Sequence, residues 1–530
     1  MLFRSGVSAL RRDQGLENHR LLSPQIRGYE VAMGENLYHP WRMAHDALRE
    51  MAFQMRSEDL RKYGEELLKR KPDRIAAAEV LDMMAYLIGC DFIGAEAKLS
   101  TIKFKFQGTT DEAYVEEATS LALAHISFAF GRFDELEQTA DHFLEKHRQN
   151  PTLEEGEYLD VLRLLAQKAL LLDQFDRVEE IYKEMVSHQK GVKATNLHYL
   201  VNSVQAMALM ARGEAIKANQ IARQNIEIAK QNKYDGLMAP IDSLFVLSKT
   251  LLAFSQKEEA LKIIVEVKNL AEQNQHWPWY FTADGSLAQE EALANQITDS
   301  LALVRAQREK MMSFNFKHNL SYLADANELF VRFVLKDKER IELLINRLPE
   351  LHIVKQIRPF MEEWNGKNML GYIEKLPDRT PREKLYKYMA LAGNFHDKES
   401  VAIDYMLQVL QIIEETGFIE YVLRQFELFD LILKAIAKQP TPFLEDLASK
   451  ITERIRTNSL NFQGGISEHL TNRELEVVRN LASGKPISHI AGNLHVSMNT
   501  MKTHLRNIYR KLEVDGRDSA VVKAKELFII

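Results

Sequence analysis

The chain has 530 residues, of which 46% are hydrophobic and 27% charged, and its formal net charge is −6. These proportions are typical of a folded globular protein and exclude an intrinsically disordered chain. The length exceeds what one hydrophobic core supports, so we expect two or more domains or a repeat array. The 23 glycines and 13 prolines are few for this length. Because both residues interrupt helices, their scarcity favours a largely helical chain.

Cysteine content and hydropathy exclude further classes of protein. Cys90 is the single cysteine, so the chain has no internal disulfide and no cysteine-rich zinc site. We expect its side chain to be a small buried hydrophobic group rather than a reactive thiol. No run approaches the ~18 uninterrupted apolar residues that span a bilayer. The arginines of residues 1–12 are not followed by a signal-peptide core, so we expect a cytoplasmic protein without membrane contact.

Residues 1–72 form an N-terminal segment that we expect to be partly irregular, since residues 1–40 show no clear periodicity. Helix after helix is predicted from about residue 73 onward, interrupted by short polar breaks. The first four breaks are about 40 residues apart, and each separates an apolar helix from an amphipathic one; with a later fifth, they are Gly131–Asp134, Asp173–Asp176, Arg212–Ala215, Ser255–Glu258 and Gly393–Asp397.

A helix pair of this period cannot bury its apolar face alone, whereas stacked pairs bury a continuous core. We therefore predict an all-α fold in which residues 73–457 form a tetratricopeptide-like α-solenoid. Between about 290 and 375 the period is too irregular for the repeats to be counted.

The densest aromatic cluster is at residues 276–281, in a segment predicted to be a loop between helices. Aromatic side chains dominate ligand pockets, so we name as candidate effector-binding residues Trp277, Trp279, Tyr280 and Phe281. The commoner alternative is that such a cluster packs a loop against the solenoid. The histidines and methionines show no metal-ligand spacing, and no catalytic constellation is found. We expect neither enzymatic activity nor a cofactor.

Residues 458–465 read Asn-Ser-Leu-Asn-Phe-Gln-Gly-Gly, and this short polar stretch is predicted to be a linker. The charge changes sign after it. Residues 466–530 hold ten Lys and Arg against seven Asp and Glu, a net +3, whereas the remainder of the chain carries −9. An acidic body with a basic end indicates one specialised end.

Three helices are predicted in residues 470–512. Thr471 and Glu474 have the spacing of a capping box, and the first helix is expected to run to about Ser483, before Gly484. A second, short helix covers about 488–494, and the third begins at the N-cap residue Ser497. Two helices joined by a tight turn at this spacing can place a recognition helix in the major groove of DNA.

The third helix, residues 497–512, divides into two faces. One face is apolar and is expected to pack on the first two helices; it holds Met501, Leu505, Ile508 and Leu512. The opposite face holds Asn499, Lys502, Thr503, Arg506 and Arg510. Lysine and arginine can donate to guanine or phosphate, and threonine can contact base edges. Periodicity alone leaves a merely solvated charged face equally open.

About 60 residues at the C-terminal end resemble, with fixed spacing, the helix-turn-helix signature of the LuxR (GerE) family of bacterial regulators. The matching positions are Leu470-Thr471-x-Arg473-Glu474-x-Glu476-Val477, Gly484, Ile490-Ala491-x-x-Leu494, Thr500-x-Lys502-x-His504 and Lys511-Leu512-x-Val514-x-x-Arg517-x-x-Ala520. Residues 490–494 and 501–514 resemble in particular the large ATP-dependent regulators of the maltose-regulon (MalT-like) type, which carry an α-solenoid before this domain.

The resemblance implies a transcription regulator, with an activator as our expectation, whose four-helix C-terminal domain spans residues 466–530 and binds double-stranded DNA as a dimer. It implies groove contacts by Lys502, Thr503 and Arg506 and phosphate contacts by Ser497, Asn499 and Thr500, with Arg510 on the same face. Dimer contacts are assigned to the last helix, through Arg517, Val521, Ala524 and Phe528. RNA polymerase and an unidentified effector are the other expected partners.

Two departures from the family pattern matter. Pro486-Ile487 and His489 replace polar and acidic residues before and within the second helix, which removes one cap and weakens the expected affinity for DNA. The sequence also lacks the Gly-x4-Gly-Lys-[Ser/Thr] pattern of the nucleotide-binding module that precedes the solenoid in the large regulators. We expect either a stripped-down regulator or a chain that begins inside a longer reading frame.

Two functional hypotheses follow. In the first, the solenoid senses a small molecule or a partner and controls dimerisation of the DNA-binding domain. In the second, the solenoid is a protein-interaction scaffold, and the terminal domain binds DNA weakly or contacts the transcription machinery.

Overall fold

The structure, a computed structural model, describes residues 57–149, 155–188, 195–232, 239–294, 296–312, 317–335, 337–348, 353–354, 357–358, 369–395, 398–425, 428–463, 470–494, 496–512 and 514–526. All regular elements in these ranges are helices, so the all-α prediction is confirmed. None of these helices is long and apolar enough to cross a membrane. The first described helix begins at Ser57, inside the segment expected to be partly irregular.

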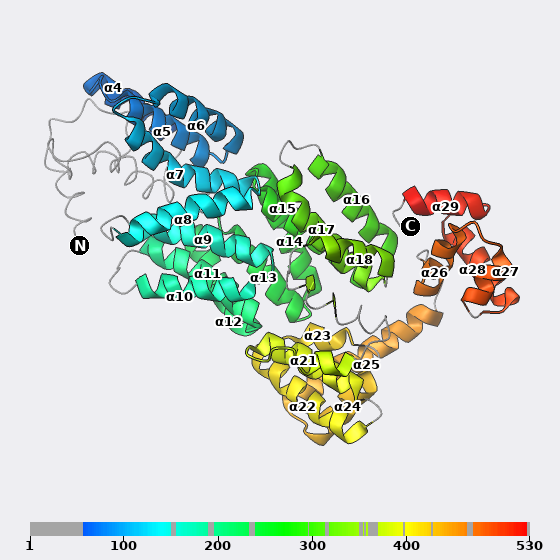
Figure 1. Cartoon of the computed structure of the whole chain (residues 1–530). Helices are drawn as coiled ribbons and strands as arrows, with labels where there is room; N and C mark the ends of the chain where they lie inside the picture. Colours follow the sequence, from blue (N-terminus) through cyan, green and yellow to red (C-terminus); the bar gives the residue numbers. More distant parts are fainter. Residues whose placement is uncertain are drawn as a thin grey trace.

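The N-terminal part is a curved stack of antiparallel helices, each packed on its neighbours in the sequence (Figure 1). In chain order they are α4 (Ser57–Arg70), α5 (Ile75–Ile88), α6 (Phe92–Phe106), α7 (Glu112–Ala129), α8 (Phe133–Gln149), α9 (Glu155–Leu171), α10 (Phe175–His188), α11 (Thr195–Arg212), α12 (Ala215–Asn232), α13 (Ile241–Ala253), α14 (Lys257–Gln273), α15 (Trp277–Leu293), α16 (Ile297–Met312), α17 (Lys317–Val334) and α18 (Lys338–Arg347).

Each helix pair turns through the same backbone hydrogen bond, in which an N–H donates to the carbonyl five residues earlier. The donors recur every 40–42 residues: Asp91, Arg132, Gln174, Glu214, Gln256, Gln296 and Asp337. At the first five turns the residue before the donor has a left-handed φ between +54° and +88°. These are the features of a Schellman helix end.

This turn extends the repeat beyond what the sequence revealed. It begins one period before Gly131, at Cys90, and continues through Gln296 and Asp337, where the sequence period was too irregular to count. Glycine, the usual residue at a left-handed helix end, occupies two of the five left-handed positions; cysteine, aspartate and serine occupy the others. The backbone turn is therefore the same in these repeats although the residue at its left-handed position varies.

The helices alternate in character, as the predicted solenoid requires. The first helix of each pair is buried on nearly all sides; in α13, twelve of the residues from Ile241 to Ala253 are buried. The second helix of each pair is amphipathic; in α14 the buried residues are Ala260, Ile264, Val267 and Ala271, one face of the helix. One apolar core runs from Leu121 to Ile357. The tetratricopeptide-like stack is thus what buries the apolar faces.

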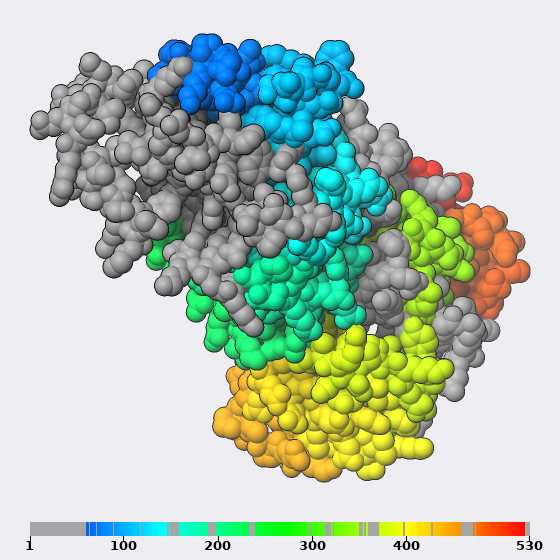
Figure 2. Space-filling view, turned by 60° about the vertical axis from the view of Figure 1, so that its left-hand side comes forward, coloured from blue at the N-terminus to red at the C-terminus, as the bar shows by residue number. Residues whose placement is uncertain are grey.

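A second body follows, although the sequence predicted one solenoid over residues 73–457. It consists of α20 (Met369–Ile373), α21 (Pro381–Asn394), α22 (Glu399–Thr416), α23 (Ile419–Leu423), α24 (Phe429–Lys438) and α25 (Pro442–Gln463). Its buried residues form a separate apolar core between Leu385 and Ile451. Figure 2 shows this body, in yellow, packed against the middle of the repeat stack.

Arginine side chains join the second body to the stack. Arg382 donates to the carbonyl oxygens of Met210 at 2.6 Å and Ala211 at 2.9 Å, at the C-terminal end of α11. The last carbonyls of a helix lie at the negative end of its dipole, where a guanidinium is favourable, and the Met210 carbonyl also accepts from the Gly213 N–H at 3.0 Å. Arg424 of the second body forms an ion pair with the Glu290 carboxylate of α15, at 3.0 Å.

The predicted linker at residues 458–465 needs correction. Helix α25 continues to Gln463, so the polar residues 458–463 are helical. Extending an existing helix fixes one residue for each hydrogen bond gained, and neither a proline nor a glycine interrupts the helix before residue 464. Polarity alone was therefore a weak signal for the helix end.

Candidate nucleic-acid interface

The C-terminal domain consists of four short helices around a small core: α26 (Asn472–Leu481), α27 (Ile487–Asn493), α28 (Met498–Lys511) and α29 (Arg517–Glu526). The apolar residues predicted to face inward from the third helix are all buried: Met501, Leu505, Ile508 and Leu512. They share one core with Leu475, Val478, Leu481 and Ile490 of the first two helices. Burial of these side chains fixes how α28 is turned about its own axis.

The start of α26 is held by the capping box predicted from the sequence. The Thr471 side chain accepts from the Glu474 N–H, and the Glu474 carboxylate accepts from the Thr471 N–H at 2.7 Å. The same carboxylate, which is buried, also accepts from Lys511 Nζ at 2.7 Å. Glu474 therefore ties the beginning of α26 to the end of α28.

Replacing Thr471 with alanine removes the acceptor for the Glu474 N–H and should destabilise the C-terminal domain by about 1 kcal/mol. Urea unfolding followed by amide exchange of the α26 backbone measures this loss. Thr471→Ser keeps the hydroxyl and is the matched control, expected to change the stability by less than half as much. Equal effects of the two variants would contradict the capping role.

The second helix lacks a side-chain cap. Pro486 occupies the N-cap of α27, with no side-chain hydrogen bond, and its carbonyl accepts from the N–H groups of His489 and Ile490. A proline at the start of a helix is compatible with helical geometry, since the first N–H groups have no partner inside the helix. The helix therefore forms despite the departure from the family pattern.

Ser497 caps the third helix as predicted, and its hydroxyl accepts from the Thr500 N–H at 3.1 Å. The Ser497 and Thr500 hydroxyls also contact each other at 2.8 Å. Further along, the Thr503 hydroxyl donates to the Asn499 carbonyl at 3.1 Å. These hydroxyl groups therefore lie together at the exposed N-terminal end of α28.

The side chains predicted to contact DNA lie together on the outer face of α28. All of them are exposed: Ser497, Asn499, Thr500, Lys502, Thr503, Arg506 and Arg510. Within the described part of the chain, neither Lys502 nor either arginine of this set forms an ion pair. Cations at successive turns of one helix face form a local positive field suited to a polyanion.

The predicted dimer residues lie differently. Ala524 is buried and Val521 half-buried against the domain core, while Arg517 donates to the Leu481 carbonyl at 2.7 Å and 3.2 Å. Phe528 lies outside the described residues. The outward face of α29 instead holds Asp518, Ser519, Val522 and Lys523. The spacing of Ala520 and Ala524, which point inward, was the signal that could have identified this face.

The aromatic cluster at residues 277–281 is helical rather than a loop. Trp277 begins α15 and Pro278 stands in its first turn, where proline is tolerated, so the loop prediction was wrong. Trp279, Tyr280 and Phe281 are buried in the main core. Trp279 packs on Phe245 with ring centroids 5.2 Å apart. The cluster thus stabilises the stack, and its role in binding an effector stays a prediction.

The helices α26–α28 form a helix-turn-helix arrangement in which α28 presents an exposed basic face. Residues 468–524 match the family described as bacterial regulatory proteins, luxR family (GerE). The C-terminal domain is therefore a LuxR-family helix-turn-helix domain. The chain joins it to an extensive all-helical N-terminal region.

Proposed function

We propose that this protein regulates transcription by binding specific double-stranded DNA with the outer face of α28. The LuxR-type domain implies DNA binding. The observation that carries the assignment to α28 is its row of exposed cations, Lys502, Arg506 and Arg510, opposite a fully buried apolar face. A helix presented in this way fits the major groove, where arginine and lysine read guanine and bind phosphate.

Footprinting on fragments of the source genome, at stated salt concentrations, tests this function. We expect discrete protected sites and an affinity that falls linearly with the logarithm of salt concentration, because bound phosphates release counterions. Equal binding of every fragment without a footprint would contradict specific readout. If a stoichiometric protein partner co-purifies as well, the scaffold hypothesis is favoured instead.

We further propose that the protein acts as a dimer on paired half-sites and activates transcription with RNA polymerase, in the manner of the MalT-like regulators. One module of this size has modest affinity, which two half-sites read by a dimer would raise. The outward face of α29, with Val522 exposed, supports pairing through this helix. Sedimentation of the protein with and without a footprinted site measures the stoichiometry, and one protein per site would contradict it.

For the effector we propose the buried interior near the start of α15. The Trp279 indole N–H and His276 Nδ1 are both buried and have no hydrogen-bond partner among the described residues. Buried polar atoms are normally hydrogen-bonded. A bound polar molecule, either water or an effector, would supply the hydrogen bonds that these two atoms lack among the described residues. Burial lowers the pKa of His276 to about 3, with His125 and Arg163 adding to the effect. His276 is therefore neutral at physiological pH and able to accept a hydrogen bond.

A further inference from the structure

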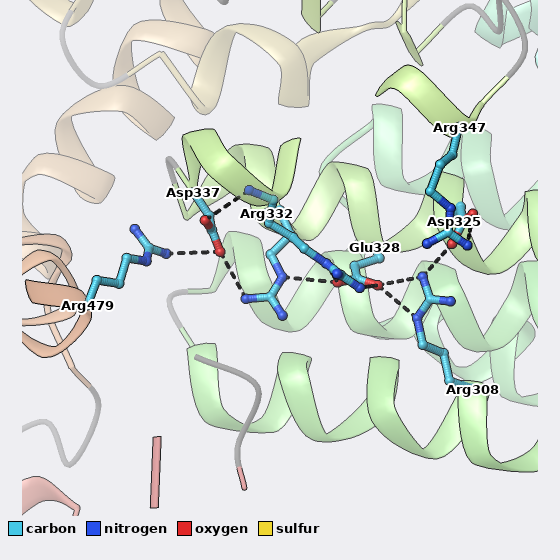
Figure 3. Close-up of polar contacts among 8 residues, drawn as sticks. Arg308, Asp325, Glu328, Arg332, Asp337, Arg347 and Arg479 are labelled. Atoms are coloured by element: carbon cyan, nitrogen blue, oxygen red, sulfur yellow. Dashed lines mark hydrogen bonds and ion pairs between the residues drawn. The ribbon is translucent and has the colours of Figure 1, made fainter. Parts of the chain in front are cut away.

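A network of alternating charges crosses the end of the repeat stack (Figure 3). Its centre is Glu328 of α17, which is 2% exposed. Arg308 of α16 and Arg340 of α18 each donate to this carboxylate at 2.8 Å. Arg332, one turn further along α17, lies between Glu328 at 3.3 Å and Asp337 at 3.1 Å. The network therefore binds α16, α17 and α18 to one another.

Charge balance keeps this network ionised. Burial by itself raises the pKa of Glu328, but the three guanidinium groups around it bring the pKa down to about 2. Asp337, at the end of the network, is held by Arg332 and also caps α18 by accepting from the Arg340 N–H at 3.4 Å. Its carboxylate is thus fixed in place at the edge of the stack.

The DNA-binding domain contacts the stack at this edge. Arg479 of α26 points toward Asp337, with Nη2 and Oδ2 3.4 Å apart (Figure 3). Apolar residues accompany the charge pair, because the core of the DNA-binding domain is continuous with a set of buried residues from α15, α16, α17 and the position just after α17: Ala288, Ala292, Leu301, Val304, Val331 and Leu335. In Figure 1, α27 and α28 lie on the side of the domain away from α16–α18.

The Arg479–Asp337 contact contributes less to stability than the packing of a domain core does. The Arg479 side chain is 25% exposed, yet its Nε and Nη2 atoms are buried and make no hydrogen bond within the described residues. Desolvation lowers the pKa of Arg479, and Asp337 offsets part of the effect. An ion pair of this length returns little more than the cost of burying the charge. The charged contact therefore adds little net free energy, and docking rests on far fewer apolar residues of the stack than the main core of the stack contains, which makes it reversible.

We propose that the DNA-binding domain docks reversibly on the end of the solenoid, with α26 against α16–α18 and Arg479–Asp337 as the charged contact. Docking leaves the cations of α28 exposed, so it sets the direction in which the recognition helix points and does not cover it. Because Asp337 is tied through Arg332 to Glu328, a shift of α16–α18 moves the partner of Arg479. A change in the packing of α16–α18 would therefore change how the DNA-binding domain is docked.

Energy transfer between two fluorophores on the full chain tests the docking. Leu343→Cys in α18 and Ser488→Cys in α27 supply exposed attachment sites, while the native Cys90 is buried. Arg479→Asp places a carboxylate opposite Asp337, and we expect the ratio of docked to undocked molecules to fall at least about tenfold. Adding Asp337→Asn to Arg479→Asp removes that repulsion and should recover part of the transfer.

Lys485→Asp is the matched control, because it makes the same change of charge at an exposed turn of the same domain. It should leave energy transfer unchanged. As a second measurement, Arg479→Gln removes the cation without adding a repulsive charge and should lower energy transfer less than Arg479→Asp, so the result does not depend on how well Arg479→Asp folds. Unchanged transfer in both Arg479 variants, or an equal loss in Lys485→Asp, would overturn the proposal. The test needs no DNA, so its failure is separate from failure of the proposed function.

Discussion

Replacing Asp242 with alanine should lower the free energy of unfolding of the repeat stack by about 3–5 kcal/mol, since it removes the nearest carboxylate from the buried Arg163 guanidinium. Asp242 of α13 is 0% exposed. Its Oδ2 accepts from Arg163 Nε at 2.9 Å and from Gln167 at 2.8 Å, both on α9, and from the Ser203 hydroxyl on α11. Side chains of three successive repeats thus converge on one carboxylate oxygen.

Urea unfolding followed by far-ultraviolet circular dichroism measures this loss. Asp299→Ala removes an exposed carboxylate from α16 and is the matched control, expected to change the stability by less than about 0.5 kcal/mol. A double variant, Arg163→Met with Asp242→Leu, replaces the pair by apolar side chains and should recover most of the loss. A loss below about 1 kcal/mol in Asp242→Ala would contradict the role of this network.

Removing Lys502 and Arg506 together should weaken binding to a footprinted site about 100-fold or more, because each side chain that reads a base contributes about 1–3 kcal/mol. Both lie on the exposed face of α28, so their loss leaves the buried face intact. Where the lost contacts are to phosphate, the slope of log affinity against log salt should fall by about one for each cation. Fluorescence anisotropy over a range of salt concentrations gives both quantities.

The matched control for this variant is Lys62→Ala with Lys103→Ala, which removes two exposed cations from the repeat stack. It makes the same change in net charge but should alter DNA affinity less than about twofold, because exposed charges beyond a Debye length of about 8 Å are screened. An equal loss in both double variants would show that the overall charge, rather than the face of α28, governs binding.

The DNA-binding domain illustrates what local sequence signals specify. The capping box at Thr471, the N-cap at Ser497 and the left-handed Gly484 were readable from the sequence and are where the structure has them. A cap and a helix end involve residues within one turn of each other, so the sequence contains the whole interaction. The apolar face of α28 followed from helical periodicity in the same way.

The wrong predictions were made from local composition at places where contacts between distant residues decide the structure. Residues 277–281 were predicted to be a loop from their composition, yet burial of Trp279 and Phe281 in the main core stabilises a helix there. The second body was likewise hidden, because its helices have the same amphipathic pattern as those of the stack. An apolar face predicts burial but not which neighbouring face it meets.

Local patterns in the sequence are therefore enough to predict the helical class, the repeat period over its clearest part and the residues exposed on α28. Local patterns do not predict which helices share a core or which charged side chains form ion pairs, because these depend on tertiary packing. Arg163 and Asp242 are 79 positions apart in the chain, and Arg479 meets Asp337 across two domains. Such pairs form because packing of many apolar side chains places them together, and no short stretch of sequence records that packing.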